Sequence, residues 1–111
     1  GHVEQDEPLT DSVVREVWEE TGLCISDVKL CGVQNWIEDG IRYLVFLYKT
    51  DKFKGNLLSS DEGDVWWAPI SKLSEFELAE SMLDMLDVFQ SENFFESFYY
   101  RENDKWVQIL K

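Results

Sequence analysis

"GHVEQDEPLTDSVVREVWEETGL" (residues 1–23) opens the chain and decides how the rest of it is interpreted. The stretch holds a single arginine, Arg15, and seven acids: Glu4, Asp6, Glu7, Asp11, Glu16, Glu19 and Glu20. Pro8 suits the first turn of a helix, because its missing N–H would have no partner there. Gly22 suits the position just after a helix end. The residues between them are therefore predicted to form a helix of roughly four turns.

Three of these acids crowd together near the C-terminal end of the predicted helix. Successive helical residues lie about 100° apart, which puts Glu20 inside the apolar sector, between Leu9 and Val13. Glu16 falls at the edge of that sector, three residues before Glu19 and four before Glu20, so the three carboxylates converge. Each like-charge pair costs roughly 0.2–0.5 kcal/mol on an exposed helix, and partial burial and the helix dipole add to that cost.

Two interpretations of this cluster follow from the residues alone. A hard divalent cation, Mg²⁺ or Mn²⁺, removes all of these costs, because it takes carboxylate oxygens as ligands. Alternatively, the acids form a solvated face in which Arg15 and Glu19 make an ordinary i,i+4 ion pair. An EF-hand fits less well, because the sequence has no D-x-D-x-D-G run.

The spacing of the stretch resembles a known family motif. It reads Gly, five residues, Glu7, seven residues, Arg-Glu-Val (15–17), one residue, Glu-Glu (19–20), one residue, Gly-Leu (22–23). This pattern is similar to the Nudix box at every defined position. In that family the box forms a loop–helix–loop and binds Mg²⁺ for hydrolysis of a nucleoside diphosphate linked to another group.

The resemblance also implies roles for individual residues. The metal ligands would be three glutamates, one of which is a candidate for the base that orients water: Glu16, Glu19 and Glu20. Arg15 would orient the carboxylates of the box, and Glu7 would be structural. Gly1 would mark the sharp loop beside the metals, where the substrate binds.

Longer segments extend the resemblance over most of the chain. "LCGVQNW" (30–36), "RYLVFLYKTDKFKG" (42–55) and "SSDEGDVWW" (59–67) resemble bacterial MutT-like Nudix hydrolases of the 8-oxo-dGTP diphosphatase type. The implied reaction converts a nucleoside triphosphate to a monophosphate and pyrophosphate, in nucleotide-pool sanitation. ADP-ribose or dinucleoside polyphosphate hydrolysis and a non-catalytic nucleotide sensor remain alternatives. Because the family has strands before its box, residues 1–111 are expected to be one Nudix domain that lacks those strands, that is, a fragment.

The remaining sequence predicts an α/β (α+β) fold with a mixed sheet, which the resemblance places between helices. The predicted hairpins are residues 28–37 with 41–50, around Asp39-Gly40, and 94–100 with 105–110. We expect a polar loop over 51–63, a short strand over 64–70 and a helix over 74–91. The apolar face of that helix is predicted to be core: Leu78, Met82, Met85, Leu86 and Phe89.

Glu62 is a further candidate for the base. By resemblance, an acid in its loop approaches the metals, whereas the alternative is a solvated turn residue beside Gly63. Asp61 and Asp64 are lesser candidates.

Aromatic and basic residues supply candidate substrate contacts. Trp36 is the preferred one, because a purine can stack on an indole. Alternation puts Trp66 and Trp67 on opposite faces of their predicted strand. Arg42 and Lys49 could neutralise phosphates, although a surface position explains them equally well.

Composition narrows the partners. The net charge of −13 argues against binding a nucleic-acid polymer, and it disfavours a bare polyphosphate unless a cation mediates. With His2 as the single histidine, a zinc site is not expected, and Cys24 and Cys31 are interpreted as buried, reduced thiols of a cytoplasmic protein. No apolar stretch approaches 18 residues, so no membrane span is expected. The sequence leaves a homodimer open.

Overall fold

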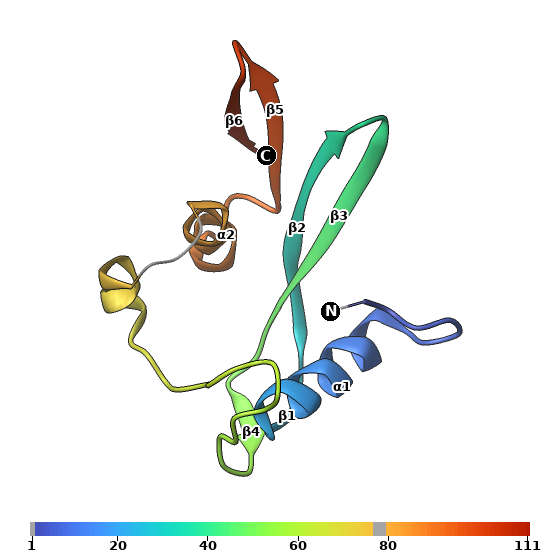
Figure 1. The fold of residues 1–111 in the computed structure, drawn as a ribbon, viewed down its shortest axis with the longest axis vertical. Helices are drawn as coiled ribbons and strands as arrows, with labels where there is room; N and C mark the ends of the chain where they lie inside the picture. The colour runs from blue at the N-terminus through green and yellow to red at the C-terminus, as the bar shows by residue number, and fades with distance from the viewer. Residues whose placement is uncertain (1, 77–79) are drawn as a thin grey trace. The chain divides into compact units, whose positions relative to one another are not determined.

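The computed structural model describes residues 2–76 and 80–111, and the chain forms two compact units. Unit 1 holds the chain through Lys29 together with Thr50–Ala68. Unit 2 holds Leu30–Lys49 together with Pro69–Lys111. That residues 1–111 act as one domain stays a prediction. Figure 1 labels the helices and strands of both units.

Unit 1 is built on helix α1 (Leu9–Thr21). Pro8 precedes the helix with φ at −61°, and its carbonyl accepts a hydrogen bond from the N–H of Ser12 at 3.0 Å. Gly22 ends the helix in the left-handed conformation, with φ at 79°, and its N–H donates to the carbonyl of Trp18 at 2.9 Å. The helix predicted between Pro8 and Gly22 is confirmed, because both ends carry residues that suit the required backbone geometry.

The loop after β4 is anchored to the end of α1. The backbone N–H of Leu58 donates to the carbonyl of Thr21 at 2.8 Å. The Leu58 side chain also lies so close to Gly22 that a Cβ on the glycine would be 3.2 Å from it. The segment that leads to Glu62 therefore starts from a fixed point on this helix.

A short antiparallel pair of strands completes unit 1, formed by β1 (Cys24–Ser26) and β4 (Lys52–Lys54). The Thr50 hydroxyl donates to the carbonyl of Ser26 and accepts the N–H of Lys52. The loop predicted over 51–63 is therefore wrong in its first part. Cys24 is exposed on β1, contrary to expectation, and forms no disulfide with Cys31.

The strand predicted over 64–70 is wrong. Residues 64–69 are irregular, and the segment starts after a single bridge between Ser60 and Gly63. Trp66 and Trp67 are 63% and 64% exposed, so neither faces a buried layer as strand alternation requires. Pro69 also lacks the N–H that a strand pair needs. The expectation that the two indoles lie on opposite faces of a strand falls with the strand.

Unit 2 contains both predicted hairpins, and both are confirmed. β2 (Lys29–Glu38) and β3 (Ile41–Lys49) are joined by a turn in which Asp39 and Gly40 have φ of 53° and 78°. β5 (Glu96–Glu102) and β6 (Lys105–Leu110) are joined by Asn103 and Asp104, with φ of 51° and 63°. Positive φ at both central residues matches the twist of paired strands.

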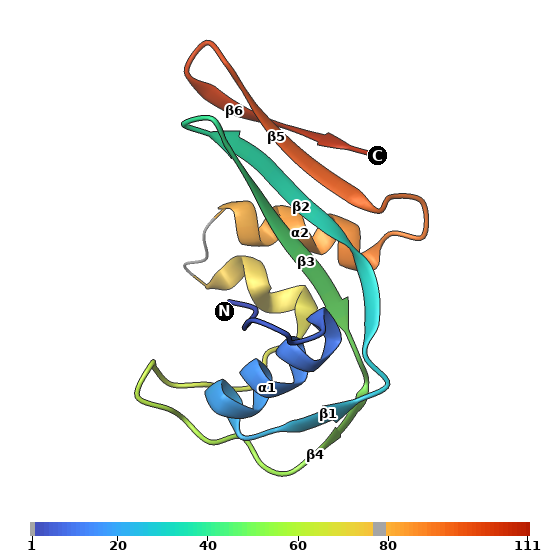
Figure 2. The ribbon, with the colours of Figure 1, turned by 90° about the vertical axis from the view of Figure 1, so that its right-hand side faces the viewer.

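The two hairpins form one mixed sheet of four strands in the order β3-β2-β5-β6 (Figure 2). β2 and β5 run parallel, with Val33 opposite Glu96, while β5 and β6 run antiparallel. The predicted mixed α/β fold is therefore confirmed. No helix of the described residues has both the length and the apolar character to cross a membrane.

Helix α2 (Glu80–Gln90) lies against this sheet, where it contacts β3 and β5. Val88 on the helix and Leu47 on β3 are buried. The predicted helix over 74–91 is confirmed for α2, whereas its beginning is part of a 3₁₀-helix, η1 (Ile70–Glu75), and Leu78 lies outside the described residues. Met82 is 50% exposed, so its assignment to the core is wrong; Met85, Leu86 and Phe89 are half-buried.

Gly32 of β2 has no room for a side chain. A Cβ at this position would lie 2.2 Å from the carbonyl oxygen of Phe95 and 2.7 Å from Cγ1 of Val88. The backbone of β2 and the segment that enters β5 therefore approach each other as closely as only glycine allows.

Gly32→Ala should lower the free energy of unfolding by about 2–3 kcal/mol, because the new methyl group overpacks the contact with Phe95. Urea denaturation measures the change. Gly40→Asn is the control: nothing lies within 4 Å of a Cβ there, and asparagine tolerates positive φ, so the cost should stay below about 1 kcal/mol. An alanine variant as stable as the native protein would contradict the close contact.

Candidate functional site

The acidic end of α1 gathers the three glutamates of the predicted site. Glu16 and Glu20 are half-buried, and the side chain of Glu16 is only 23% exposed. The side chain of Glu19 is 48% exposed, so Glu19 lies on the more open side of the cluster. Two of the three carboxylates are thus partly removed from water, as the helical positions predicted.

Arg15 ties the box together. Its Nε and Nη2 donate to both oxygens of Glu7, at 2.9 and 3.1 Å, which is a bidentate contact. Its Nη1 donates to Glu16 Oε1 and Glu19 Oε2, each at 3.1 Å, and Nη2 also reaches the carbonyl of His2 at 3.1 Å. One guanidinium therefore bridges the loop before the helix and the acids on it. The i,i+4 ion pair of Arg15 with Glu19, expected from the alternative interpretation, is part of the same network.

These contacts shift the protonation of the pair. The hydrogen bond from Arg15 lowers the pKa of Glu7, and the backbone N–H of Glu4 lowers it further. The same bond to Glu7, with a contribution from Glu19, raises the pKa of Arg15 well above its usual range. Both groups stay charged at neutral pH, which suits an orienting role for Arg15 and a structural one for Glu7.

Glu20 experiences the opposite effect. Burial raises its pKa, and the side-chain contact with Glu16 and the charge of Glu62 raise it further. Glu62 is exposed in the loop that Leu58 anchors, and its N–H donates to the Ser60 hydroxyl at 3.2 Å. The structure therefore brings a distant acid, Glu62, to bear on Glu20, which the sequence proposed only by resemblance.

The donor set fits a divalent cation in its chemistry. Carboxylate oxygens are the ligands that hard cations prefer, and a cation would relieve the repulsion that raises the pKa of Glu20. Within residues 2–76 and 80–111, no three histidine, cysteine, aspartate or glutamate side chains gather closely enough to hold a metal as they stand. Gly1, predicted beside the metals, lies outside the described residues.

The basic candidates of unit 2 make contacts within the protein. Arg42 Nη1 donates to Asn35 Oδ1 at 2.6 Å, and the guanidinium lies 5.9 Å from the centroid of the Phe98 ring. Lys49 Nζ donates to the carbonyl of Phe89 at 3.1 Å. Neither contact involves the acids of α1, and a phosphate-binding role for Arg42 stays a prediction.

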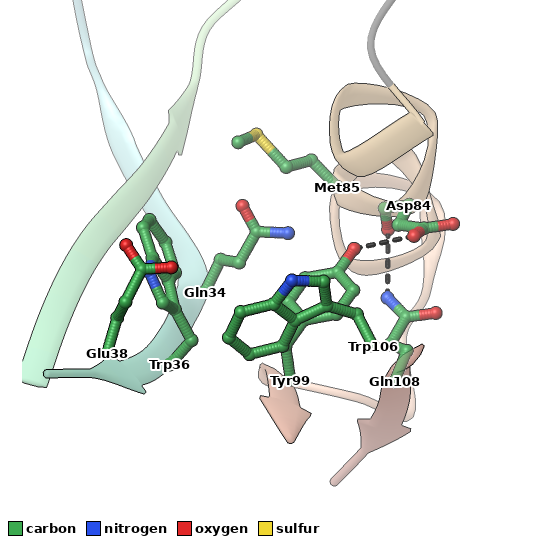
Figure 3. A pocket seen from close by; sticks show the side chains of 8 residues that line it. All are labelled: Gln34, Trp36, Glu38, Asp84, Met85, Tyr99, Trp106 and Gln108. Atoms are coloured by element: carbon green, nitrogen blue, oxygen red, sulfur yellow. Dashed lines mark hydrogen bonds between the residues drawn. The ribbon is translucent and has the colours of Figure 1, made fainter. Parts of the chain in front are cut away.

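Trp36 lines a cavity of about 710 Å³ in unit 2. The cavity lies between the strands and α2, and Figure 3 shows side chains entering it from both sides. Its lining residues are Gln34, Trp36, Glu38, Asp84, Met85, Tyr99, Trp106 and Gln108. Sequence analysis proposed only Trp36 among them as a substrate contact, although residues 34, 36 and 38 share one face of a strand and could have been found by alternation.

With this geometry established, the sequence was compared with known proteins. Residues 1–89 match the family model of the NUDIX domain. The chain belongs to the Nudix family. This Nudix protein is 32% identical over 93 residues to an uncharacterized Nudix hydrolase, YvcI of Bacillus subtilis strain 168, a match that covers 78% of this chain and 59% of YvcI. It is 39% identical over 49 residues to the phosphatase NudJ of Escherichia coli K12, which covers 43% of this chain and 32% of NudJ.

The Nudix fold is confirmed by a solved structure. The crystal structure of a MutT protein from Bacillus halodurans matches 99% of this chain and 78% of its own, with a TM-score of 0.82 and 24% identity. The fold of this Nudix protein is thus MutT-like. The chain spans less than two thirds of the curated relatives described above. Hydrolases of the Nudix family generally use divalent metal ions, which agrees with the oxygen donors of α1.

Glu62→Gln should lower the pKa of Glu20 part of the way to its ordinary value, because it removes one negative charge and leaves the burial unchanged. Carboxyl NMR titration of the Nudix protein without metal measures the shift. Asp61→Asn is the matched control and should leave the pKa of Glu20 where it is. A Glu20 pKa that is the same with and without the Glu62 charge would contradict the coupling.

Proposed function

We propose that this protein is a Nudix pyrophosphohydrolase that converts a nucleoside triphosphate and water to a nucleoside monophosphate and pyrophosphate. The observation that carries the proposal is the half-buried pair Glu16 and Glu20, which lies beside the Arg15 network in the box of a Nudix domain. A structural role alone gives no reason to keep these like charges together, whereas cation-dependent hydrolysis does.

We further propose that the cation is Mg²⁺, with Mn²⁺ as a substitute, held by Glu16, Glu19 and Glu20. When bound, such an ion neutralises phosphate charge and acidifies the attacking water. The net charge of −13 would otherwise repel the polyphosphate. Arg15 orients the ligands, because its guanidinium fixes Glu16 and Glu19 while Glu7 holds it from the other side.

Glu20 and Glu62 are the two carboxylates proposed to accept the proton of the attacking water. A base works best when its pKa approaches the working pH, and burial moves Glu20 in that direction. Glu62 is exposed and close enough to influence Glu20, which makes it the second candidate.

The proposed substrate is 8-oxo-dGTP, in keeping with the resemblance to MutT-like hydrolases described above. ADP-ribose and dinucleoside polyphosphates test the alternative of another nucleoside diphosphate derivative. Steady-state assays of the full-length protein with dGTP, 8-oxo-dGTP, dATP, ADP-ribose and diadenosine tetraphosphate rank these substrates. Ligand-dependent thermal stabilisation with zero turnover on all of them would instead identify a sensor. The cytoplasmic location and a homodimer stay predictions.

Glu20→Gln should reduce kcat on the best triphosphate by about 100-fold or more, because the amide keeps the size and loses the charge. The assay is release of pyrophosphate under saturating substrate. Asp11→Asn, on the same helix but outside the cluster, is the control and should retain activity. Turnover of Glu20→Gln close to that of the native protein would refute the proposed function.

Removal of divalent ions with EDTA should abolish turnover, and adding Mg²⁺ or Mn²⁺ should restore it, because the triphosphate is not expected to bind productively against the acidic helix alone. Full activity in EDTA would contradict a metal-dependent reaction. Restoration by Mg²⁺ in Asp11→Asn but not in Glu20→Gln would connect the ion to the cluster.

A further inference from the structure

The cavity of unit 2 combines flat rings with hydrogen-bonding groups. Two indoles, Trp36 and Trp106, line it together with the amides Gln34 and Gln108. Its volume of about 710 Å³ lies in the range of small-molecule sites. Indole rings offer stacking surfaces, and amides offer both donors and acceptors, so this lining suits a planar nitrogen heterocycle.

Trp36 is held in place before any ligand arrives. Its ring stacks on Tyr43 of the neighbouring strand, with centroids 5.4 Å apart and planes 12° from parallel. A ring that is already fixed loses little conformational freedom when a ligand stacks on it. The β2–β3 hairpin thus presents a preorganised aromatic surface to the cavity.

Asp84 is held as an acceptor. The Tyr99 hydroxyl donates to Asp84 Oδ2 at 2.6 Å, a bond drawn in Figure 3. Burial and the bond to Asp84 raise the pKa of Tyr99 well above its usual range, so the hydroxyl keeps its proton. No hydrogen bond printed among the described residues engages Oδ1 of Asp84, which leaves this oxygen for a ligand.

A carboxylate acceptor distinguishes purine edges. The guanine edge offers two adjacent donors, N1–H and the 2-amino group, whereas adenine presents the lone pair of N1 beside its amino group. The lone pair would face the negative charge of Asp84, and a site that expects a donor rejects a ligand that lacks one.

We propose that this cavity is a purine-recognition site in which Asp84 favours a guanine-type edge over adenine, and in which Tyr99 positions Asp84. The proposal rests on the proposed function, since it names the base class of the same nucleotide substrate. The reaction itself is assigned to unit 1 and base selection to unit 2, so the two can be tested separately.

Binding of monophosphates to the full-length protein in EDTA tests the selection without hydrolysis. We expect dGMP to bind at least tenfold more tightly than dAMP, with dIMP, which lacks the 2-amino group, between them. Calorimetry gives the affinities. In ¹⁵N NMR spectra, dGMP should shift the indole signals of Trp36 and Trp106.

Tyr99→Phe removes the hydroxyl and keeps the ring, so the ratio of dGMP to dAMP affinity should fall at least threefold. Tyr100→Phe is the matched control, because its hydroxyl contacts Glu102 at 3.4 Å and its side chain does not line the cavity. Asp84→Asn should remove the preference, because an amide presents a donor as well as an acceptor. Asp87→Asn, exposed on the same helix, should retain it.

Equal binding of dGMP and dAMP to the native protein would overturn the proposal. An unchanged ratio in Tyr99→Phe would overturn the positioning role. If Asp84→Asn does not fold, the native ratio and Tyr99→Phe still decide. Metal-dependent hydrolysis without purine preference would refute this inference alone, whereas purine preference without hydrolysis would refute only the proposed function.

Discussion

Repulsion between half-buried carboxylates is the constraint on which unit 1 depends. Arg15 offsets most of it: one guanidinium neutralises Glu7 and shares its remaining donors between Glu16 and Glu19. The imbalance that is left concentrates on Glu20, whose pKa is raised by burial and by neighbours of the same sign. Such a group stabilises the fold least when it is ionised and gains most from a cation. Structure and chemistry therefore meet at this residue.

Features set by local geometry could be predicted from the sequence. Pro8 and Gly22 mark the ends of α1 through their own backbone restrictions, and Asp39-Gly40 fixes the first hairpin through positive φ. The contact of Arg15 with the acids also follows from spacing, because residues one and four apart lie along one helix. Each of these predictions needed only neighbours in the sequence.

Features that depend on distant partners could not be predicted in the same way. β1 and β4 exist only because each pairs with the other, and the irregular segment over 64–70 has strand-like composition but no such partner among the described strands. In the cavity, Trp36 was found by its chemistry, whereas Asp84 and Tyr99 gain their meaning from a bond between α2 and β5. The effect of Glu62 on Glu20 likewise joins a loop to a helix.

The hydrogen bond from Leu58 to the carbonyl of Thr21 turns the following loop into a short tether of set length. Only a few residues separate that anchor from Glu62, so the reach of this carboxylate is a matter of residue count as much as of side-chain identity. Insertions between the anchor and Glu62 would detune the electrostatics of the helix end. Insertions after Gly63 would leave them alone, which divides one exposed loop into a part under functional constraint and a part open to variation.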